Sequence, residues 1–380
     1  MLLEREAAPW PRGSRAPIRI LVVAGTRPEA IKLAPLKLEA AWRPEVALTL
    51  VGTGQHRAMF TEALAPFGVA ADEMLTLVGP GQTIDEQAAA IHAAMPALVA
   101  RHRPDLVVVQ GDTTTAWAAA LAAHEAGVPV AHVEAGLRSG DPNLPWPEER
   151  NRIEIDRIAD LLFAPTGAAV ANLQREGVPG RIHLTGNSGI DALLRLRDTA
   201  TPRLRETGKR LIVATCHRRE NQGEPLARIA AALRRLAARA DVEILVPLHK
   251  NPAAGAAMAA LLDGSTAIRL VPALGYTDMI AAIMDADLVL SDSGGLQEEC
   301  PALGVPLLVL RDNSERPEAI ACGNARLVGS DTDRIVAEAS RLLDDPALHA
   351  AMARPAFPFG TGDAAKTMLD LIERFPLVRS

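Results

Sequence analysis

The sequence predicts an α/β protein in which two doubly wound parallel-sheet domains follow one another along the chain. Two observations predict this fold. Short apolar runs alternate with Ala- and Leu-rich helical stretches, and the alternation weakens near residues 187–209 before it begins again. Repeated strand–helix–strand order gives a parallel sheet with helices on both faces. The length of 380 residues also fits two domains, since a domain usually has about 100–200 residues.

The expected strands are short apolar runs bounded by turn residues. In the first half they lie at 18–24, 46–51, 106–110, 130–133 and 161–164, with helices such as 29–41, 83–102 and 114–125 between them. In the second half they lie at 210–215, 243–247, 268–271, 288–291 and 306–310. We therefore expect a flexible extension at 1–17, one domain at 18–186, a second at 187–362, and a final helix, about 363–380, that packs back on the first domain.

Composition excludes several classes of protein. The net charge of -6 gives no basic face for nucleic acid. No apolar run reaches the roughly 20 residues that cross a membrane, and residues 1–17 lack the apolar core of a signal peptide. The 3 cysteines are widely spaced and predict neither a disulfide framework nor a metal site. We therefore expect a cytoplasmic protein without membrane or nucleic-acid partners.

Ligands of doubly wound sheets bind beyond the carboxyl ends of the strands, so the loops after strands carry the functional predictions. After the first strand, Gly25 permits a sharp turn and Arg27 adds a cation to a helix N-terminus that can attract phosphate. An ordinary helix start with a surface arginine is an equal alternative. The loop lacks the G-x-G-x-x-G pattern, so a nicotinamide cofactor is not favoured.

Three carboxylates follow in the next loops of the first domain. Asp112 lies after one strand, although it could be only a helix N-cap. Glu134 closes a buried strand, which is costly unless it is paired or functional, and Arg138 is its expected partner. Glu148 precedes Glu149 at a helix start, where the helix dipole alone could explain both. Together the three carboxylates are typical of an acid/base set.

The second domain repeats this placement with a histidine. His217 follows a strand and is flanked by Arg218 and Arg219, and His249 follows the next strand. A lone histidine is usually structural, but one at a strand end beside cations titrates near neutral pH and suits proton transfer.

A Ser-Gly-Gly turn in the second domain indicates phosphate binding. Ser293, Gly294 and Gly295 lead into a helix, whose backbone N–H groups can approach a phosphate closely. Glu299, one turn later, could reach ribose hydroxyls or be a solvated helix residue. The loop after the next strand adds Arg316.

The loops after the strands contain a series of distinctive sequence strings: GTRPEAIK (25–32), TGQHR (53–57), QGDTTT (110–115), HVEAGLRSGD (132–141), PWPEERNR (145–152), TGN (185–187), HRREN (217–221), SDSGGLQEE (291–299) and ERPEA (315–319). Together these strings resemble the non-hydrolysing UDP-N-acetylglucosamine 2-epimerases, and they occur in the family's order from near residue 18 to near residue 365. Hydrolysing relatives usually lack a histidine-bearing string like the one at 217–221.

The resemblance implies two Rossmann-like domains of the glycosyltransferase-B type, a homodimer, and an active site in the cleft between the domains. It implies reversible C2 epimerisation of a UDP-sugar through UDP and 2-acetamidoglucal, without a metal or cofactor. The roles carried over are catalytic for Asp112, Glu134, Glu148 and His217; UDP contact for Arg27, Ser293, Gly294, Gly295, Glu299 and Arg316; electrostatic support for Lys32 and Arg138; and a second UDP-GlcNAc site, present in some members, for Gln55, Arg218 and His249.

Several alternatives remain open. A hydrolysing epimerase would release free ManNAc and UDP, and an epimerase could act on a modified UDP-acetamido sugar. A glycosyltransferase or a non-catalytic sugar-nucleotide sensor could share the fold, although neither needs this acid/base set. The sequence does not assign which carboxylate acts on which face of the sugar.

Overall fold

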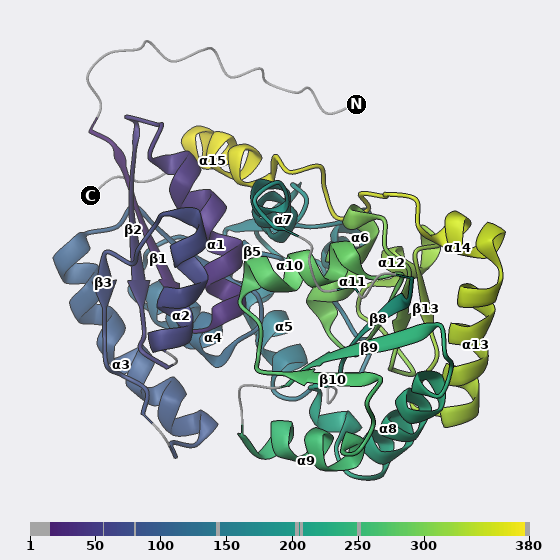
Figure 1. The fold of residues 1–380 in the computed structure, drawn as a ribbon. Coiled ribbons are helices and arrows are strands. Elements are labelled where there is room, and N and C mark those ends of the chain that lie inside the picture. Colours follow the sequence, from purple (N-terminus) through teal and green to yellow (C-terminus); the bar gives the residue numbers. More distant parts are fainter. Residues whose placement is uncertain are drawn as a thin grey trace.

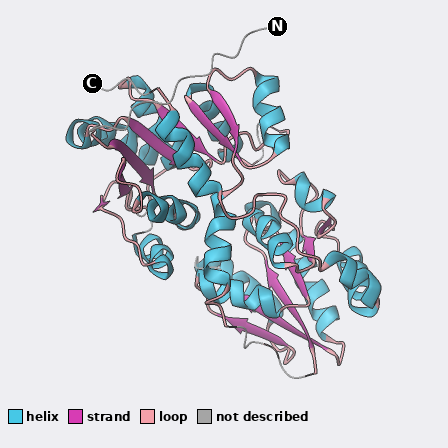
Figure 2. Cartoon of the chain, turned by 90° about the horizontal axis from the view of Figure 1, so that it is seen from above, coloured by secondary structure: helices cyan, strands magenta, loops and turns pink. Residues whose placement is uncertain are grey.

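The computed structural model describes residues 16–55, 57–79, 81–141, 145–201, 205, 208–248 and 252–376, and its chain forms two parallel sheets (Figure 1). Residues 1–15 of the expected extension and the second-site candidate His249 lie outside these residues. The predicted fold class is confirmed, because every strand pair in both sheets is parallel. Figure 2 shows helices on both faces of the strands.

The first sheet is built from the first half of the chain and has the strand order β3-β2-β1-β4-β5-β6-β7. Its elements are β1 (Ile18–Ala24), α1 (Arg27–Ala40), β2 (Val46–Gly52), α2 (Arg57–Leu64), the 3₁₀ turn η1 (Ala65–Phe67), β3 (Glu73–Met74), α3 (Ile84–His102), β4 (Leu106–Gln110), α4 (Thr114–Glu125), β5 (Val130–Val133), α5 (Glu148–Ile158), β6 (Leu161–Ala164), α6 (Gly167–Glu176) and β7 (Arg181–Leu184).

The second sheet follows α7 (Ser188–Arg197) and has the order β10-β9-β8-β11-β12-β13. Its elements are β8 (Arg210–Thr215), the 3₁₀ turn η2 (Arg219–Asn221), α8 (Glu224–Ala237), β9 (Val242–Pro247), α9 (Pro252–Leu262), β10 (Ile268–Val271), α10 (Tyr276–Asp285), β11 (Leu288–Ser291), α11 (Gly294–Leu303), β12 (Leu307–Val309), α12 (Pro317–Ala321) and β13 (Ala325–Leu327); α13 (Thr332–Asp344), α14 (Pro346–Met352) and α15 (Ala364–Arg374) follow.

The sequence missed three strands, and all lie near or at sheet edges. β3 and β7 are the two edges of the first sheet, and β13 is an edge of the second. β3 has only 2 residues, and β7 is partly exposed along its whole length. Edge strands are commonly short and less apolar, so they lack the buried run by which a central strand is recognised.

Both sheets reverse their strand order at one point, and these points place the functional loops. The reversal lies between β1 and β4 in the first sheet and between β8 and β11 in the second. Loops that leave neighbouring strands there diverge to opposite faces and open a crevice between them. The loops that carry Arg27, Asp112, His217 and Ser293 follow these four strands.

A continuous apolar core joins the two domains. Helix α7 packs against α1, α10, α11 and α15, so it contacts both halves of the molecule (Figure 1). Ile190 and Leu193 of α7 are buried in one cluster with residues of both domains. Helix α15 also lies against α1, where Arg43 forms ion pairs with Asp370 and Glu373. No helix of the described residues is both long and apolar enough to span a membrane.

Gly136, in the turn after β5, has no room for a side chain. Its φ is +83°, and a Cβ there would lie 2.4 Å from the carbonyl oxygen of Ala169. We expect Gly136→Ala to lower the free energy of unfolding by about 1–2 kcal/mol for the positive φ and a further 1–3 kcal/mol for the overlap.

Gly127→Ala is the matched control, because Gly127 has a φ of +71° and open space around its Cα. Urea unfolding of both variants measures the difference. Equal losses of stability would contradict the predicted overlap.

Candidate active site

The loop after β1 is fastened to the loop after β4 by a buried carboxylate. Glu29 is fully buried and accepts hydrogen bonds from Gly25 N at 3.0 Å, Thr26 N at 2.7 Å and the Thr113 hydroxyl at 2.8 Å. Burial raises the pKa of Glu29, and the three donors oppose this shift. Glu29 thereby fixes Arg27 relative to Asp112.

Arg27 faces the second domain from the first turn of α1. It forms no hydrogen bond within the described residues. Burial lowers the pKa of Arg27, while the nearby Glu299 of α11 opposes that shift. Arg27 is therefore a cation with free donors, held close to the helix that follows the Ser-Gly-Gly turn.

Glu134 lies at the junction of the two domains. Its backbone has a φ of +71°, rare for a residue with a side chain. Its carboxylate is paired with Lys32, accepts from Gln110 Nε2, and accepts from Arg316 Nη2 of the second domain at 3.1 Å. It is only 8% exposed.

The predicted Arg138–Glu134 pair is wrong. The tight turn from Glu134 to Gly136 separates the two side chains, and Arg138 instead binds Asp156 at 2.8 Å and Glu176 at 2.7 Å. Arg138 also lines a cavity of about 450 Å³ between α5, α6 and the segment after β12.

Arg316 is the centre of a buried charge cluster. Besides Glu134, it donates to Glu298 at 2.5 Å and to Glu315 at 2.6 Å. Burial alone would lower the pKa of Arg316, but Glu298, Glu315 and Glu134 together raise it. Lys32 lies 3.9 Å from Glu298 as well, and its two carboxylate neighbours raise its pKa against burial. Arg316 and Lys32 therefore stay charged although they are buried.

Glu315 holds further cations beside this cluster. Its carboxylate accepts from Arg311 at 2.8 Å and from Arg218 at 3.3 Å. Burial alone would raise the pKa of Glu315, but Arg316, Arg311 and Arg218 hold it well below its usual range. Arg218 is thus kept next to Arg316.

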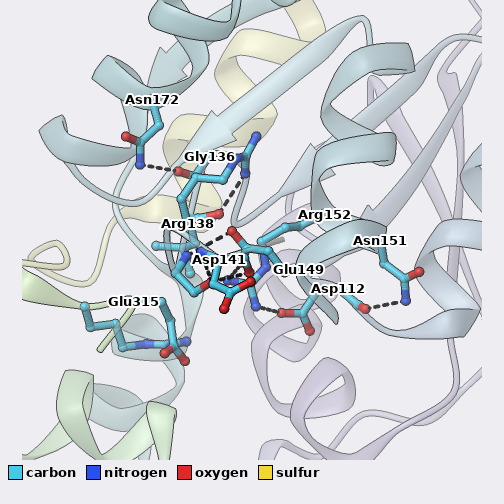
Figure 3. Close-up of polar contacts among 12 residues, drawn as sticks. Asp112, Gly136, Arg138, Asp141, Glu149, Asn151, Arg152, Asn172 and Glu315 are labelled. Carbon is cyan, nitrogen blue, oxygen red and sulfur yellow. Dashed lines mark hydrogen bonds and ion pairs between the residues drawn. The ribbon is translucent and has the colours of Figure 1, made fainter. Parts of the chain in front are cut away.

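Asp112 is held by helix α5. Its carboxylate is paired with Arg152, and its carbonyl accepts from Asn151 Nδ2 at 2.9 Å (Figure 3). The alternative role of Asp112 as a helix cap is wrong, because Thr113 caps α4. The Asp112 side chain is 31% exposed and remains accessible.

The two glutamates that begin α5 differ in environment. Glu149 is buried, accepts from Ser139 N at 3.0 Å and lies 3.2 Å from Arg152. Burial raises the pKa of Glu149. Glu148 is half-buried and forms no hydrogen bond or ion pair with the described residues. Glu149 therefore has a structural role, whereas Glu148, the first residue of the same helix, has no such partner among the described residues.

His217 is placed by Asp292, which the sequence did not single out. The Asp292 carboxylate is fully buried and accepts from His217 N at 3.0 Å, Arg218 N at 2.9 Å and Asn221 Nδ2 at 2.9 Å. One carboxylate therefore fastens the loop after β8 to the loop after β11.

The start of α11 is an anion site by its geometry. A Cβ at Gly294 would lie 2.6 Å from Arg316 Nη1 and 3.2 Å from Arg218 Nη2, so only glycine fits beneath the two guanidinium groups. Ser293 is the N-cap of the helix, and Gly295 follows in its first turn. Two cations and a helix N-terminus converge there, as a phosphate requires.

Glu299 lies one turn further along α11. The Tyr276 hydroxyl donates to it at 3.0 Å. Burial and the neighbouring Glu298 raise the pKa of Glu299 to about 7, although Tyr276, Lys32 and Arg27 oppose this shift.

The structure brings Glu134, Lys32 and Arg316 into contact, places Gly294 and Arg218 beside Arg316, and places Arg27 near Glu299. Gln55 lies beside the Gly25 turn and bonds to Gln87 at 3.3 Å. Sequence reasoning missed Glu298, Glu315, Arg152 and Asp292, although all four lie within the quoted family strings. Among the described residues, no group of three or more His, Cys, Asp or Glu side chains is placed to hold a metal ion.

We expect Arg316→Ala to destabilise the protein by about 3–5 kcal/mol, since it leaves buried carboxylates without their shared cation. Arg326→Ala is the control; its ion pair with Glu338 is one-third exposed and is worth about 0–1 kcal/mol. Urea midpoints provide the comparison. An Arg316→Ala protein as stable as the control would mean that the cluster contributes nothing to stability.

Comparison with known proteins identifies the family of the chain. The family model described as UDP-N-acetylglucosamine 2-epimerase matches residues 38–373. UDP-N-acetylglucosamine 2-epimerase of Escherichia coli K12 is 40% identical over 370 residues, covering 94% of this chain and 98% of that protein. The crystal structure of the Neisseria meningitidis enzyme bound to UDP-GlcNAc has a TM-score of 0.89 and 36% identity, with 94% of this chain and 100% of that chain covered.

A more distant likeness bears on the fold alone. The glycosyltransferase of kitacinnamycin has a TM-score of 0.63 at 17% identity, with 96% of this chain and 99% of that chain covered. The two-sheet architecture is therefore of the glycosyltransferase-B type. The family match and the close relatives both extend over nearly the whole chain, and the chain belongs to the UDP-N-acetylglucosamine 2-epimerase family, isomerases that interconvert UDP-GlcNAc and UDP-ManNAc.

Proposed function

We propose that this chain epimerises UDP-GlcNAc at C2 by eliminating UDP and adding it back to 2-acetamidoglucal. One observation carries the proposal: Glu134, a proton acceptor from the first domain, lies against Arg316, which also forms the anion site at Gly294 in the second domain. Proton removal from the sugar and departure of the diphosphate would thus occur side by side.

The chemistry requires both groups. The hydrogen at C2 is not acidic in the ground state. Breaking the C1–O bond to UDP builds positive charge at C1, and this charge makes the C2 proton removable. The electron pair of the C2–H bond forms the C1–C2 double bond, the proton goes to a carboxylate, and UDP leaves with the C1–O pair. Cations aligned with the diphosphate stabilise the charge that develops on it.

In the proposal, the diphosphate binds at the start of α11. Ser293, Gly294 and Gly295 supply the helix N-terminus, while Arg27 and Arg316 supply charge. Glu299 accepts from the ribose hydroxyls. The diphosphate would compete with Glu134 for Arg316, so substrate binding itself would release the carboxylate for proton transfer.

Two faces of C2 need two proton-handling groups. We propose that these come from Asp112, Glu134, Glu148 and His217, which lie on loops or helix starts around the junction of the domains. Lys32 supports Glu134 directly. Arg138 supports the set indirectly, since its guanidinium is engaged by Asp156 and Glu176.

We also propose that the enzyme acts as a cytoplasmic homodimer. Free cysteines among the described residues suit a reducing compartment. Gln55 and Arg218 remain candidates for a second UDP-GlcNAc site; Arg218 lies against Gly294, so in this chain it is also placed to contact the first diphosphate. Sedimentation velocity tests the dimer.

Proton NMR of the purified protein with UDP-GlcNAc in heavy water, without added metal or nicotinamide, tests the function. We expect UDP-ManNAc with deuterium at C2. Free ManNAc and UDP would instead identify a hydrolysing epimerase. No reaction would overturn the proposal in favour of a modified UDP-sugar as substrate or a sensor role.

We expect Glu134→Gln to lower turnover at least about 100-fold, because the amide cannot accept the C2 proton. UDP affinity should not fall, since the change removes a negative charge beside Arg316 and Lys32. NMR measures turnover and calorimetry measures UDP affinity. Glu125→Gln is the control, because the Glu125 side chain is exposed. Wild-type turnover would remove Glu134 from the catalytic set.

We expect UDP affinity to rise between about pH 6 and pH 8. Burial raises the pKa of Glu299 to about 7 in the free protein, and ribose hydroxyls that donate to the ionised carboxylate lower it again. By linkage, binding then releases a proton, so affinity rises with pH up to about the higher pKa, that of the free protein, and levels off above it.

Calorimetry across this range should show the dependence reduced in Glu299→Gln, leaving only the titration of UDP itself. Identical pH profiles for the two proteins would contradict a ribose contact by Glu299.

A further inference from the structure

A fully buried histidine lies beneath the proposed site, and the mechanism does not use it. His132 is in β5, two residues before Glu134. Its Nδ1 lies 2.6 Å from Asp156 Oδ1, and its Nε2 lies 2.8 Å from the carbonyl oxygen of Gly111. Both side chains of the pair are 0% exposed, so neither contacts a substrate.

These contacts connect the segments that carry the proposed acid/base set. Gly111 immediately precedes Asp112. The other oxygen of Asp156 accepts from Gly136 N at 3.1 Å, in the turn that follows Glu134, and from Arg138 at 2.8 Å. Asp156 itself is in α5, one turn after Arg152, which holds the Asp112 carboxylate.

The hydrogen-bond partners define the state of the ring. A peptide carbonyl can only accept, so Nε2 carries a hydrogen. Burial alone would raise the pKa of Asp156, but His132 and Arg138 hold it below its usual range. Asp156 is therefore an ionised acceptor, and Nδ1 also carries a hydrogen. Each ring nitrogen thus has its own acceptor, and an ion pair joins Arg138 to Glu176 beside the ring.

We propose that His132 is a positioning residue of the epimerase, which uses both ring N–H groups to fix Asp112 relative to Glu134. Through Gly111 it sets the backbone before Asp112, and through Asp156 it sets the turn after Glu134. This proposal rests on the proposed function, because it concerns the separation of two groups that exchange protons with C2. A shift of about 1 Å in such a group is enough to cost about 100-fold in rate.

Two variants test the hydrogen bonds of the two ring nitrogens separately. The amide of His132→Asn can replace Nδ1 and keep the bond to Asp156, whereas that of His132→Gln can replace Nε2 and keep the bond to Gly111. We expect each to lower kcat by about 10- to 100-fold. KM and UDP affinity should change less than about threefold, because the proposed UDP contacts lie elsewhere.

His102→Gln is the matched control, since His102 also pairs with a carboxylate, Glu73, but lies at the far edge of the first sheet. Its kcat should match the wild type. A wild type that does not exchange hydrogen at C2 would overturn the proposed function before any variant is compared. Wild-type kcat in both His132 variants, or an equal loss of kcat and UDP affinity, would overturn the positioning role.

Nitrogen NMR of histidine-labelled wild-type protein tests the ring without any activity. The His132 signals are assigned by their loss in the variants, or by selective labelling if the variants do not fold. Because an acceptor lies beside each ring nitrogen, the signals should show hydrogen on both. Only one protonated nitrogen would overturn the proposal.

Discussion

The structure depends on the buried contact between Glu134 and Arg316. Buried charges are costly unless they are paired, and here the cation and the carboxylate of each domain pair with those of the other. The first domain contributes Lys32 and Glu134, and the second contributes Arg316 and Glu298. The two doubly wound sheets must therefore meet at this point, and the proposed proton acceptor is held beside the proposed diphosphate site.

Helix α7, which connects the two domains, packs next to that contact. Helix α7 packs on α1 of the first domain and on α10 and α11 of the second, and its N-cap Asn187 donates to Glu298 at 2.9 Å. The connection between the domains thus takes part in both the apolar core and the charge cluster. The points where the strand order reverses then direct the loops of both sheets towards the junction.

The same arrangement, a buried carboxylate that accepts backbone N–H groups, holds three loops that carry proposed site residues. Glu29, Asp156 and Asp292 are fully buried carboxylates, and each accepts backbone N–H groups from a loop that carries a proposed site residue. Backbone donors need a partner when they are buried, and a carboxylate can satisfy several at once. Rigid loops around accessible side chains such as Asp112 suit a reaction that needs accurate positions for two proton-handling groups.

The sequence by itself determined the central strands, the edge strand β10, the two-domain order and the loops that carry the proposed site, because burial and turn chemistry are local patterns. It did not determine the other three edge strands, which lack such a pattern, or the partners of charged side chains. Arg138 was expected to pair with Glu134, but the positive φ at Glu134 and Gly136 separates them. Which cation neutralises which carboxylate depends on residues far apart in the sequence, and only the tertiary structure brings Arg316 to Glu134, 182 positions away.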